Sequence, residues 1–145
     1  MEPTQLHLRK LEFSADDTAQ LILACRLKRT TLTGLPHALI LVSLSKRLKA
    51  EEAAAFVATT PVSLTGLADP PAGIDLHESL SVLVTGFYHE YLAELVQDIR
   101  QFPQDADSGV NDVTWDIARR TSMELKQKVK TLPKDDIMGY VKLGA

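Results

Sequence analysis

The sequence has few of the residues on which disulfide-rich or membrane-spanning proteins depend. Cys25 is the single cysteine among 145 residues, so no disulfide can form within the chain and a cytoplasmic setting is expected. Its apolar runs, such as residues 38–42, are far shorter than the ~20 residues that a helix needs to span a bilayer. Residues 1–10 are polar and lack the basic-then-apolar order of a secretory signal. We therefore expect a soluble protein with no membrane span.

The chain also lacks a basic surplus, a glycine-rich loop and a metal-binding motif. It has 16 basic and 19 acidic residues, a net charge of -3, which argues against a nucleic-acid partner. The seven glycines are isolated, so no phosphate-binding or dinucleotide-binding loop is present. The four histidines are too widely spaced for a recognisable metal motif. They are His7, His37, His77 and His89.

The hydrophobic pattern predicts one domain that contains both helices and strands. Alternating apolar residues predict strands around residues 6–13, 56–64 and 80–86, the last ending at Gly86. Helical spacing predicts helices over residues 15–29, 35–48 and 91–102, and a last long helix that begins at Asn111 or Asp112 and ends before Pro133. Ser14, followed by two aspartates, is a typical start for the first helix. We expect an α+β fold in which a small sheet of two to three strands packs with about four helices.

The predicted helix over residues 35–48 is apolar nearly all round, which indicates burial on several sides. So small a chain offers few neighbours for such a helix, and this hints at a missing partner or an exposed apolar patch.

Each residue that could take part in catalysis is also weighed as a purely structural residue. His37 lies in the first turn of the predicted helix and is interpreted as a hydrogen-bonded core residue. His89 follows the last predicted strand, where strand ends often line clefts, and it is the best candidate for a functional histidine, with His77 behind it. Cys25 falls on the apolar face of its helix, where a free cysteine is usually inert.

From residue 6 to about residue 141 the chain resembles the fungal alcohol acetyltransferase-like proteins of the coenzyme A-dependent acyltransferase superfamily. That superfamily also includes chloramphenicol acetyltransferase and the condensation domains of peptide synthetases. The order and spacing of the matching stretches resemble the start of the family's second half. These stretches are residues 13–18, 23–26, 30–35, 37–39, 55–64, 80–86, 115–119, 124–126 and 132–136.

The resemblance implies a partial chloramphenicol acetyltransferase-like half-domain over residues 1–145, with acetyl-CoA as the co-substrate of the family. The family's catalytic signature is a histidine followed four positions later by aspartate, and the histidine is the general base. The four histidines here are followed at that distance by Leu11, Leu41, Ser81 and Ala93, so no catalytic residue carries over. The chain is expected to be inactive alone.

In the superfamily, substrates meet in a channel between two similar halves, which implies a set of acyl-CoA-binding residues in this chain. The set is Thr59, Thr60, Ser63, Thr85 and Gly86. Alternatively, Thr59 and Thr60 only satisfy strand hydrogen bonds. Three functions stay open: part of an alcohol or amine acetyltransferase whose partner is the missing catalytic half, a non-catalytic interaction module that binds a partner or a second copy, and an independent enzyme that uses His89 or His77.

Overall fold

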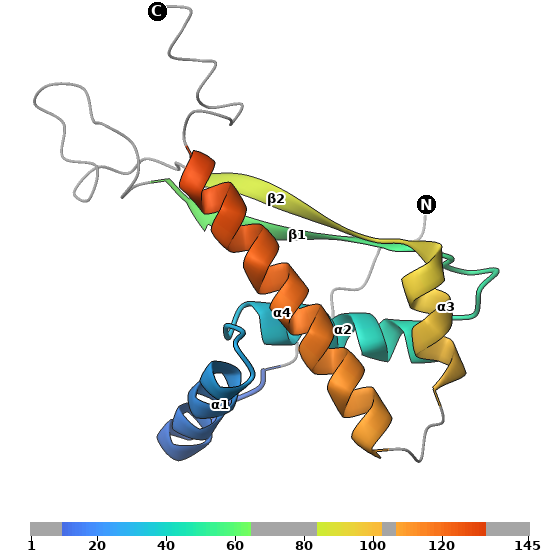
Figure 1. Ribbon diagram of the computed structural model, residues 1–145, viewed down its shortest axis with the longest axis horizontal. Coiled ribbons are helices and arrows are strands. Elements are labelled where there is room, and N and C mark those ends of the chain that lie inside the picture. Colours follow the sequence, from blue (N-terminus) through green and yellow to red (C-terminus); the bar gives the residue numbers. More distant parts are fainter. Residues whose placement is uncertain (1–9, 65–83, 103–106, 133–145) are drawn as a thin grey trace, which may run out of the picture.

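The computed structural model describes residues 10–64, 84–102 and 107–132 of the chain. Its elements follow in the order α1 (Ala15–Leu27), α2 (Gly34–Arg47), β1 (Phe56–Ser63), β2 (Val84–Tyr91), α3 (Ala93–Gln101) and α4 (Asp107–Thr131). In Figure 1, α4 crosses α2 and reaches the strand pair, and α3 lies at the opposite end of that pair. Four helices and a two-stranded antiparallel sheet among the described residues confirm the predicted α+β class.

Helix α1 begins with the predicted serine cap. The Asp17 amide donates to Ser14 Oγ over 3.1 Å, and the Ser14 amide donates back to Asp17 Oδ2 over 3.3 Å. At the other end Arg29 adopts a φ of 56°, and the Thr30 amide donates to the Cys25 carbonyl over 2.8 Å. This arrangement satisfies the free groups at both helix ends with local partners. Cys25 is the buried residue of α1, as the sequence analysis expected.

Helix α2 packs closely against α4. The buried side of α2 includes Leu35, Ala38 and Leu41. A Cβ added to Gly34 would lie 2.5 Å from the Ala118 carbonyl oxygen, so only glycine allows this approach of the two helices. The opposite side of α2 is open: Leu39 and Ile40 are 52% and 58% exposed. The expectation of burial on several sides is therefore met on one side only.

The free backbone groups at the two ends of α2 bond to side chains other than that of Thr33, the residue directly before the helix. Thr33 precedes the helix but makes no capping bond, and the Gly34 amide donates instead to Thr31 Oγ1 over 3.1 Å. Beyond the other end, the Arg100 guanidinium donates to the carbonyls of Ser45, Leu48 and Ala53. One side chain on α3 thereby occupies several carbonyls around the end of α2.

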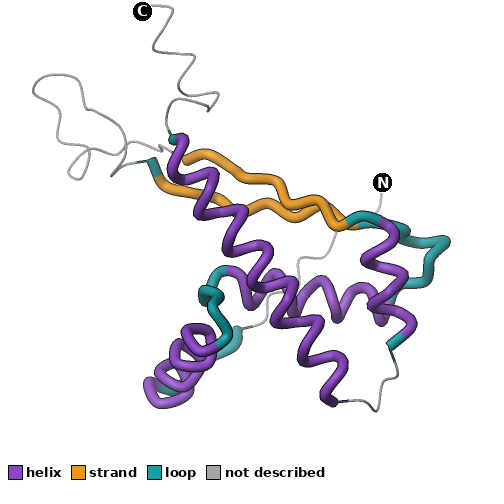
Figure 2. The backbone as a smooth tube through the Cα atoms, in the orientation of Figure 1, coloured by secondary structure: helices purple, strands orange, loops and turns teal. Residues whose placement is uncertain are grey.

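The strands form a hairpin whose buried face continues the core. Strand β1 pairs with β2 in antiparallel register from Phe56–Tyr91 to Ser63–Val84. Every second residue of β2 is buried, beginning with Thr85 and ending with Tyr91. Helices cover this face, and Figure 2 shows the hairpin running beside them. The core cluster contains Ala38, Leu41, Tyr91, Val96, Ile99, Ile117 and Ala118.

Three predicted boundaries were wrong. Residues 10–13 form no strand, and residues 6–9 lie outside the described residues. The second strand continues beyond Gly86 to Tyr91, because each residue of this stretch pairs with β1. Helix α4 begins at Asp107, a turn before the expected caps. Among the described residues, none of the helices is both long and apolar enough for a membrane crossing.

Candidate functional site

Four side chains from four elements form a continuous hydrogen-bonded chain beneath the hairpin. Thr60 Oγ1 of β1 lies 2.8 Å from His37 Nε2 of α2 and 3.0 Å from His89 Nε2 of β2. His89 Nδ1 lies 2.9 Å from Glu124 Oε2 of α4. Burial of His89 is complete, with 0% of its side chain exposed. We call these four residues the Thr60 network.

Strand pairing explains why the network forms at this point. Thr60 is directly opposite Phe87, so His89 is its diagonal neighbour on the same face of the hairpin. Both are buried, because alternate residues of each strand face the helices. Glu124 shares its side of α4 with Ile117 and Thr121, since the spacings of seven and three residues fall on one helix face.

The carboxylate of Glu124 is held in its charged form. Burial alone would raise the pKa of Glu124, but the hydrogen bonds from His89 and from Arg120, together with the Arg120 charge, lower it overall. Arg120 Nε donates to Glu124 Oε1 over 2.9 Å and leaves Oε2 to accept from His89. Beside this carboxylate, the neutral form of the His89 ring is the tautomer that carries its proton on Nδ1.

That assignment sets the direction of the remaining bonds. With its proton on Nδ1, His89 presents the Nε2 lone pair to Thr60, so the Thr60 hydroxyl donates to it. The same oxygen then accepts from His37 Nε2–H. The pKa of His37 is lowered, first by burial and second by nearby His89, so this ring favours its neutral form. The two rings meet edge to face with centroids 5.0 Å apart.

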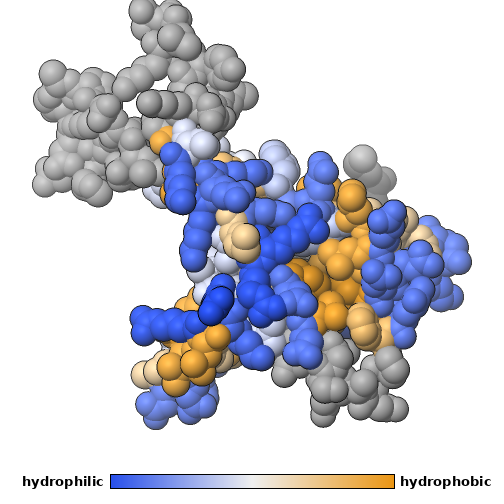
Figure 3. Space-filling view, in the orientation of Figure 1, coloured by the Kyte–Doolittle hydropathy of each residue, from blue (hydrophilic) through white to orange (hydrophobic). Residues whose placement is uncertain are grey.

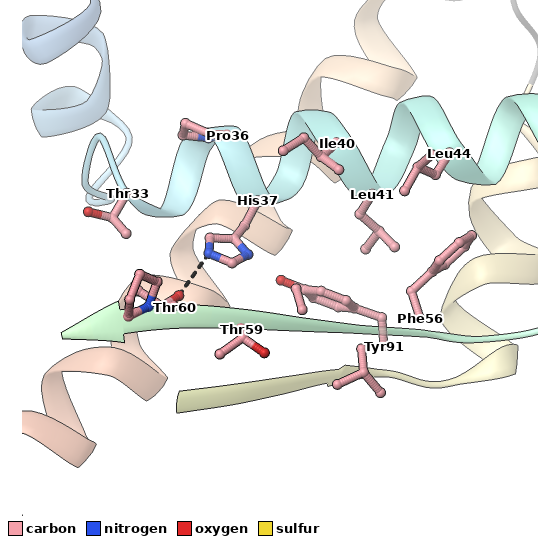
Figure 4. Close-up of a pocket in the computed structure, with 13 residues that line it drawn as sticks. Thr33, Pro36, His37, Ile40, Leu41, Leu44, Phe56, Thr59, Thr60 and Tyr91 are labelled. Carbon is pink, nitrogen blue, oxygen red and sulfur yellow. Dashed lines mark hydrogen bonds between the residues drawn. The ribbon is translucent and has the colours of Figure 1, made fainter. Parts of the chain in front are cut away.

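An apolar groove with a cavity volume of about 540 Å³ runs between α2 and β1 beside the network. In Figure 4 the His37 side chain points from α2 toward β1 and meets Thr60, with Leu41, Leu44, Phe56 and Tyr91 further along. A second cavity, of about 590 Å³, lies between β1 and α4 and includes Lys126 and Lys130 in its wall. Both cavities are lined by Thr33, Thr60 and Pro61.

The structure divides the predicted acyl-CoA residues among three places. Thr59 and Thr60 line the groove between α2 and β1, and Ser63 lines the second cavity. Thr85 is 9% exposed within β2, and exposed Gly86 pairs with Pro61; neither lines these two cavities. Thr60 also bonds to two histidines through its side chain, which goes beyond strand pairing.

The structure confirms the prediction for His37 and corrects the one for His89. His37 is half-buried and hydrogen-bonded, which confirms its interpretation. His89 was expected beyond the strand, at an open end; it lies instead inside β2 and is buried, because its polar side chain belongs to the alternating inward face. His7 and His77 lie outside the described residues. Burial raises the pKa of the Cys25 thiol, which keeps it protonated.

Glu124 and the partnership of Thr60 with both histidines were not predicted from the sequence. The helical spacing of Ile117, Thr121 and Glu124 was a usable signal for an inward carboxylate. The period-two series from Thr85 to Tyr91 was the corresponding signal for His89. Their convergence depends on the crossing of α2 and α4, which no local pattern encodes.

Over 134 residues, 90% of this chain, the sequence is 26% identical to the probable alcohol acetyltransferase FCK4 of Fusarium pseudograminearum. The match covers 25% of that protein, so the chain spans about a quarter of the length of this curated relative. No family model and no solved structure matches the chain. The likeness to a chloramphenicol acetyltransferase half-domain stays a prediction.

Proposed function

We propose that this chain is one part of an acetyl-CoA-dependent alcohol or amine acetyltransferase-like protein. The observation that carries the proposal is a similarity that covers nearly all of this chain but a quarter of an alcohol acetyltransferase. In this proposal the chain works in the cytoplasm, and its partner is the missing catalytic half. The histidine–aspartate signature of the family is absent from the sequence, so the chain alone does not acetylate an alcohol.

The groove between α2 and β1 serves in this proposal as one wall of the channel for acyl-CoA. It is lined mainly by apolar side chains, which suit an acyl chain, and Thr59 and Thr60 add hydroxyl groups on β1. Ile40 lines it while 58% exposed, so the wall is open to a partner surface or to a ligand. Ser63 lines the second cavity and extends the proposed contact surface beyond the groove. Thr85 and Gly86 stay in the proposed acyl-CoA set through the family resemblance alone.

Binding of octanoyl-CoA, measured by isothermal titration calorimetry on the 145-residue chain, tests this role. We expect binding by the wild type and loss of binding in Ile40→Asp, which places a charge in the apolar wall. Leu23→Asp on α1 is the matched control, because Leu23 is 57% exposed and does not line the groove. Equal binding by both variants would remove the groove from the proposal.

A separate assay tests the proposal that the chain alone does not acetylate an alcohol. The chain is incubated with acetyl-CoA and a panel of alcohols and amines, and the acetylated products are measured by gas chromatography. We expect none above the uncatalysed level. Formation of an acetyl ester of an added alcohol by the chain alone would contradict the proposed dependence on a missing half.

A second candidate function is a non-catalytic interaction module, and the exposed apolar side chains favour it. Leu23 and Leu27 on α1 are 57% and 75% exposed, and Leu39 on α2 is 52% exposed. Figure 3 shows apolar surface over α1 and between α4 and α3. Sedimentation velocity discriminates the two candidates: self-association that Leu27→Asp abolishes would support the module, and a monomer at every concentration would count against a homo-oligomer.

A further inference from the structure

Three members of the Thr60 network are arranged in the order of a nucleophile, a base and an orienting carboxylate. Thr60 Oγ1 lies 3.0 Å from His89 Nε2, and His89 Nδ1 lies 2.9 Å from Glu124 Oε2. Hydroxyl, imidazole and carboxylate groups joined through these two ring nitrogens form the constellation that activates a hydroxyl for acyl transfer. The three residues come from three elements, and their order in the chain does not matter for the chemistry.

The surroundings hold each group in the required state. Arg120 bonds to the other oxygen of Glu124, which fixes the carboxylate against His89. The His89 side chain is 0% exposed, so its ring is held in one orientation between Thr60 and Glu124. His37 Nε2 lies 2.8 Å from the hydroxyl oxygen and donates to it, which stabilises negative charge that develops there as the proton leaves.

Thr60 is also the member of the triad that borders open space. It lines both the apolar groove and the second cavity, whereas His89 and Glu124 line neither. An acyl group in the groove would rest against Leu41, Leu44 and Phe56, and a leaving group would face the second cavity. Apolar walls on the groove side select esters or thioesters with an uncharged, apolar acyl group.

We propose that Thr60, His89 and Glu124 form an acyl-transfer triad in which Thr60 Oγ1 accepts an acyl group from an ester or thioester bound in the groove. The Oγ1–H bond breaks and its proton passes to His89 Nε2 while Oγ1 bonds to the carbonyl carbon. The bond from that carbon to the leaving oxygen or sulfur then breaks with its electron pair. The leaving group takes the proton from His89 and departs as an alcohol or thiol.

The acyl group remains as an ester on Thr60 until water attacks it. His89 accepts a proton from that water and returns a proton to Thr60 Oγ1 as the carboxylic acid is released, so the triad is restored. Thr60 and His89 are the catalytic residues, and Glu124 is a positioning residue. This inference rests on the geometry of the network and is independent of the proposed function, because it requires neither an acceptor alcohol nor a second half.

The test uses the complete 145-residue chain and p-nitrophenyl acetate as the probe. Wild-type protein is expected to release p-nitrophenol in a burst of one equivalent per chain, followed by slower turnover to acetate. Peptide mass spectrometry of acid-quenched protein is expected to map the acetyl group to Thr60. This mapping needs no variant, so the result stands even where a substitution disturbs folding. A folded wild type that releases p-nitrophenol at the buffer rate, or carries its acetyl group elsewhere, overturns the proposal.

The variants separate the three roles. Thr60→Val loses the hydroxyl and is expected to abolish burst and label, while Thr60→Ser keeps both. Thr131→Val at the C-terminal end of α4 is the matched control with wild-type rates, because the Thr131 hydroxyl bonds to the Lys128 carbonyl and not to the Thr60 network. Glu124→Gln is expected to slow acylation by roughly a hundredfold or more with KM unchanged. Nitrogen-15 spectra of the His89 ring report its role directly: the proton should leave its fixed place on Nδ1 in Glu124→Gln. A burst that survives in folded Thr60→Val would also overturn the triad.

Discussion

Helices α1 and α2 follow each other in the chain and have nearly equal lengths, 13 and 14 residues, but they are stabilised by different means. Helix α1 satisfies both of its ends with neighbours in sequence and buries little beyond Cys25. Helix α2 has no side-chain bond from Thr33 and depends on α4, α3 and the hairpin. Strong local signals and tertiary burial are therefore alternative ways to stabilise a helix, although burial usually supplies most helical stability.

The largest effect that this comparison predicts follows from crowding at the crossing of α2 and α4. Gly34→Ala places a Cβ 2.5 Å from the Ala118 backbone oxygen and 2.4 Å from Ser122 Oγ, so the helices must separate. We expect a loss of about 3 kcal/mol in the free energy of unfolding, measured by urea denaturation. In the control Gly86→Ala, the new Cβ meets only the Thr59 methyl at 3.0 Å, and we expect a loss of about 1 kcal/mol or less.

Leucine truncations on the two helices compare burial directly. Leu41 of α2 is 2% exposed, so Leu41→Ala leaves a cavity and should cost about 3 kcal/mol. Leu23 of α1 is 57% exposed, so Leu23→Ala should change stability by about 0.5 kcal/mol or less. Thermal or urea unfolding measures both. A cost at Leu23 equal to that at Leu41 would show that α1 is covered in solution.

A substitution at the serine cap of α1 tests the local bonds on which this helix depends. Ser14→Ala removes the acceptor for the Asp17 amide and should cost about 1 kcal/mol. Because α1 buries little, the effect should be confined to α1 and appear as faster amide hydrogen exchange there, with the exchange of α2 and α4 unchanged. Thr33→Ala before α2 is the matched control, and it should be nearly silent because Thr33 makes no capping bond.

The smallest predicted effect is a dependence of stability on pH that comes from the Thr60 network. The folded state lowers the pKa of His37 below its ordinary 6.5 and that of Glu124 below its ordinary 4.5, so both groups bind protons more weakly when folded. The free energy of unfolding therefore falls as the pH falls below the ordinary pKa of each group. The decline due to His37 begins first, below 6.5, and the decline due to Glu124 follows below 4.5. Urea midpoints measured from neutral pH downward should decline in that order. In His37→Gln the earlier decline should be absent.

The parts of the fold that the sequence predicted are those that local chemistry determines. Ser14 with Asp17 fixed the start of α1, and helical spacing located α2 and α3 within one or two residues. The second strand was ended too early at Gly86, although its inward alternation continues through Phe87, His89 and Tyr91. His89 is buried there because Glu124 and Thr60 satisfy its ring nitrogens, which is a tertiary effect.

The candidate site was predictable only as separate pieces. Thr60 and His89 were singled out for different reasons, one as a channel residue and one as a strand-end histidine, and nothing in their spacing of 29 residues joined them. Glu124 was one of many charged residues on a long amphipathic helix. Its partnership with His89 requires the pairing register of the hairpin and the crossing of α4, and both are properties of the whole chain.

Ser122 on α4 gives the molecule a particular order of assembly. Its hydroxyl bonds to Thr30 Oγ1, to the Thr31 amide and to Thr31 Oγ1, groups that lie 92 and 91 residues earlier in the chain. During synthesis the corner between α1 and α2 leaves the ribosome long before the hydroxyl that secures it. The nascent chain must therefore keep the apolar surface of α2 uncovered until α4 is made, which is the interval in which chaperones protect such segments.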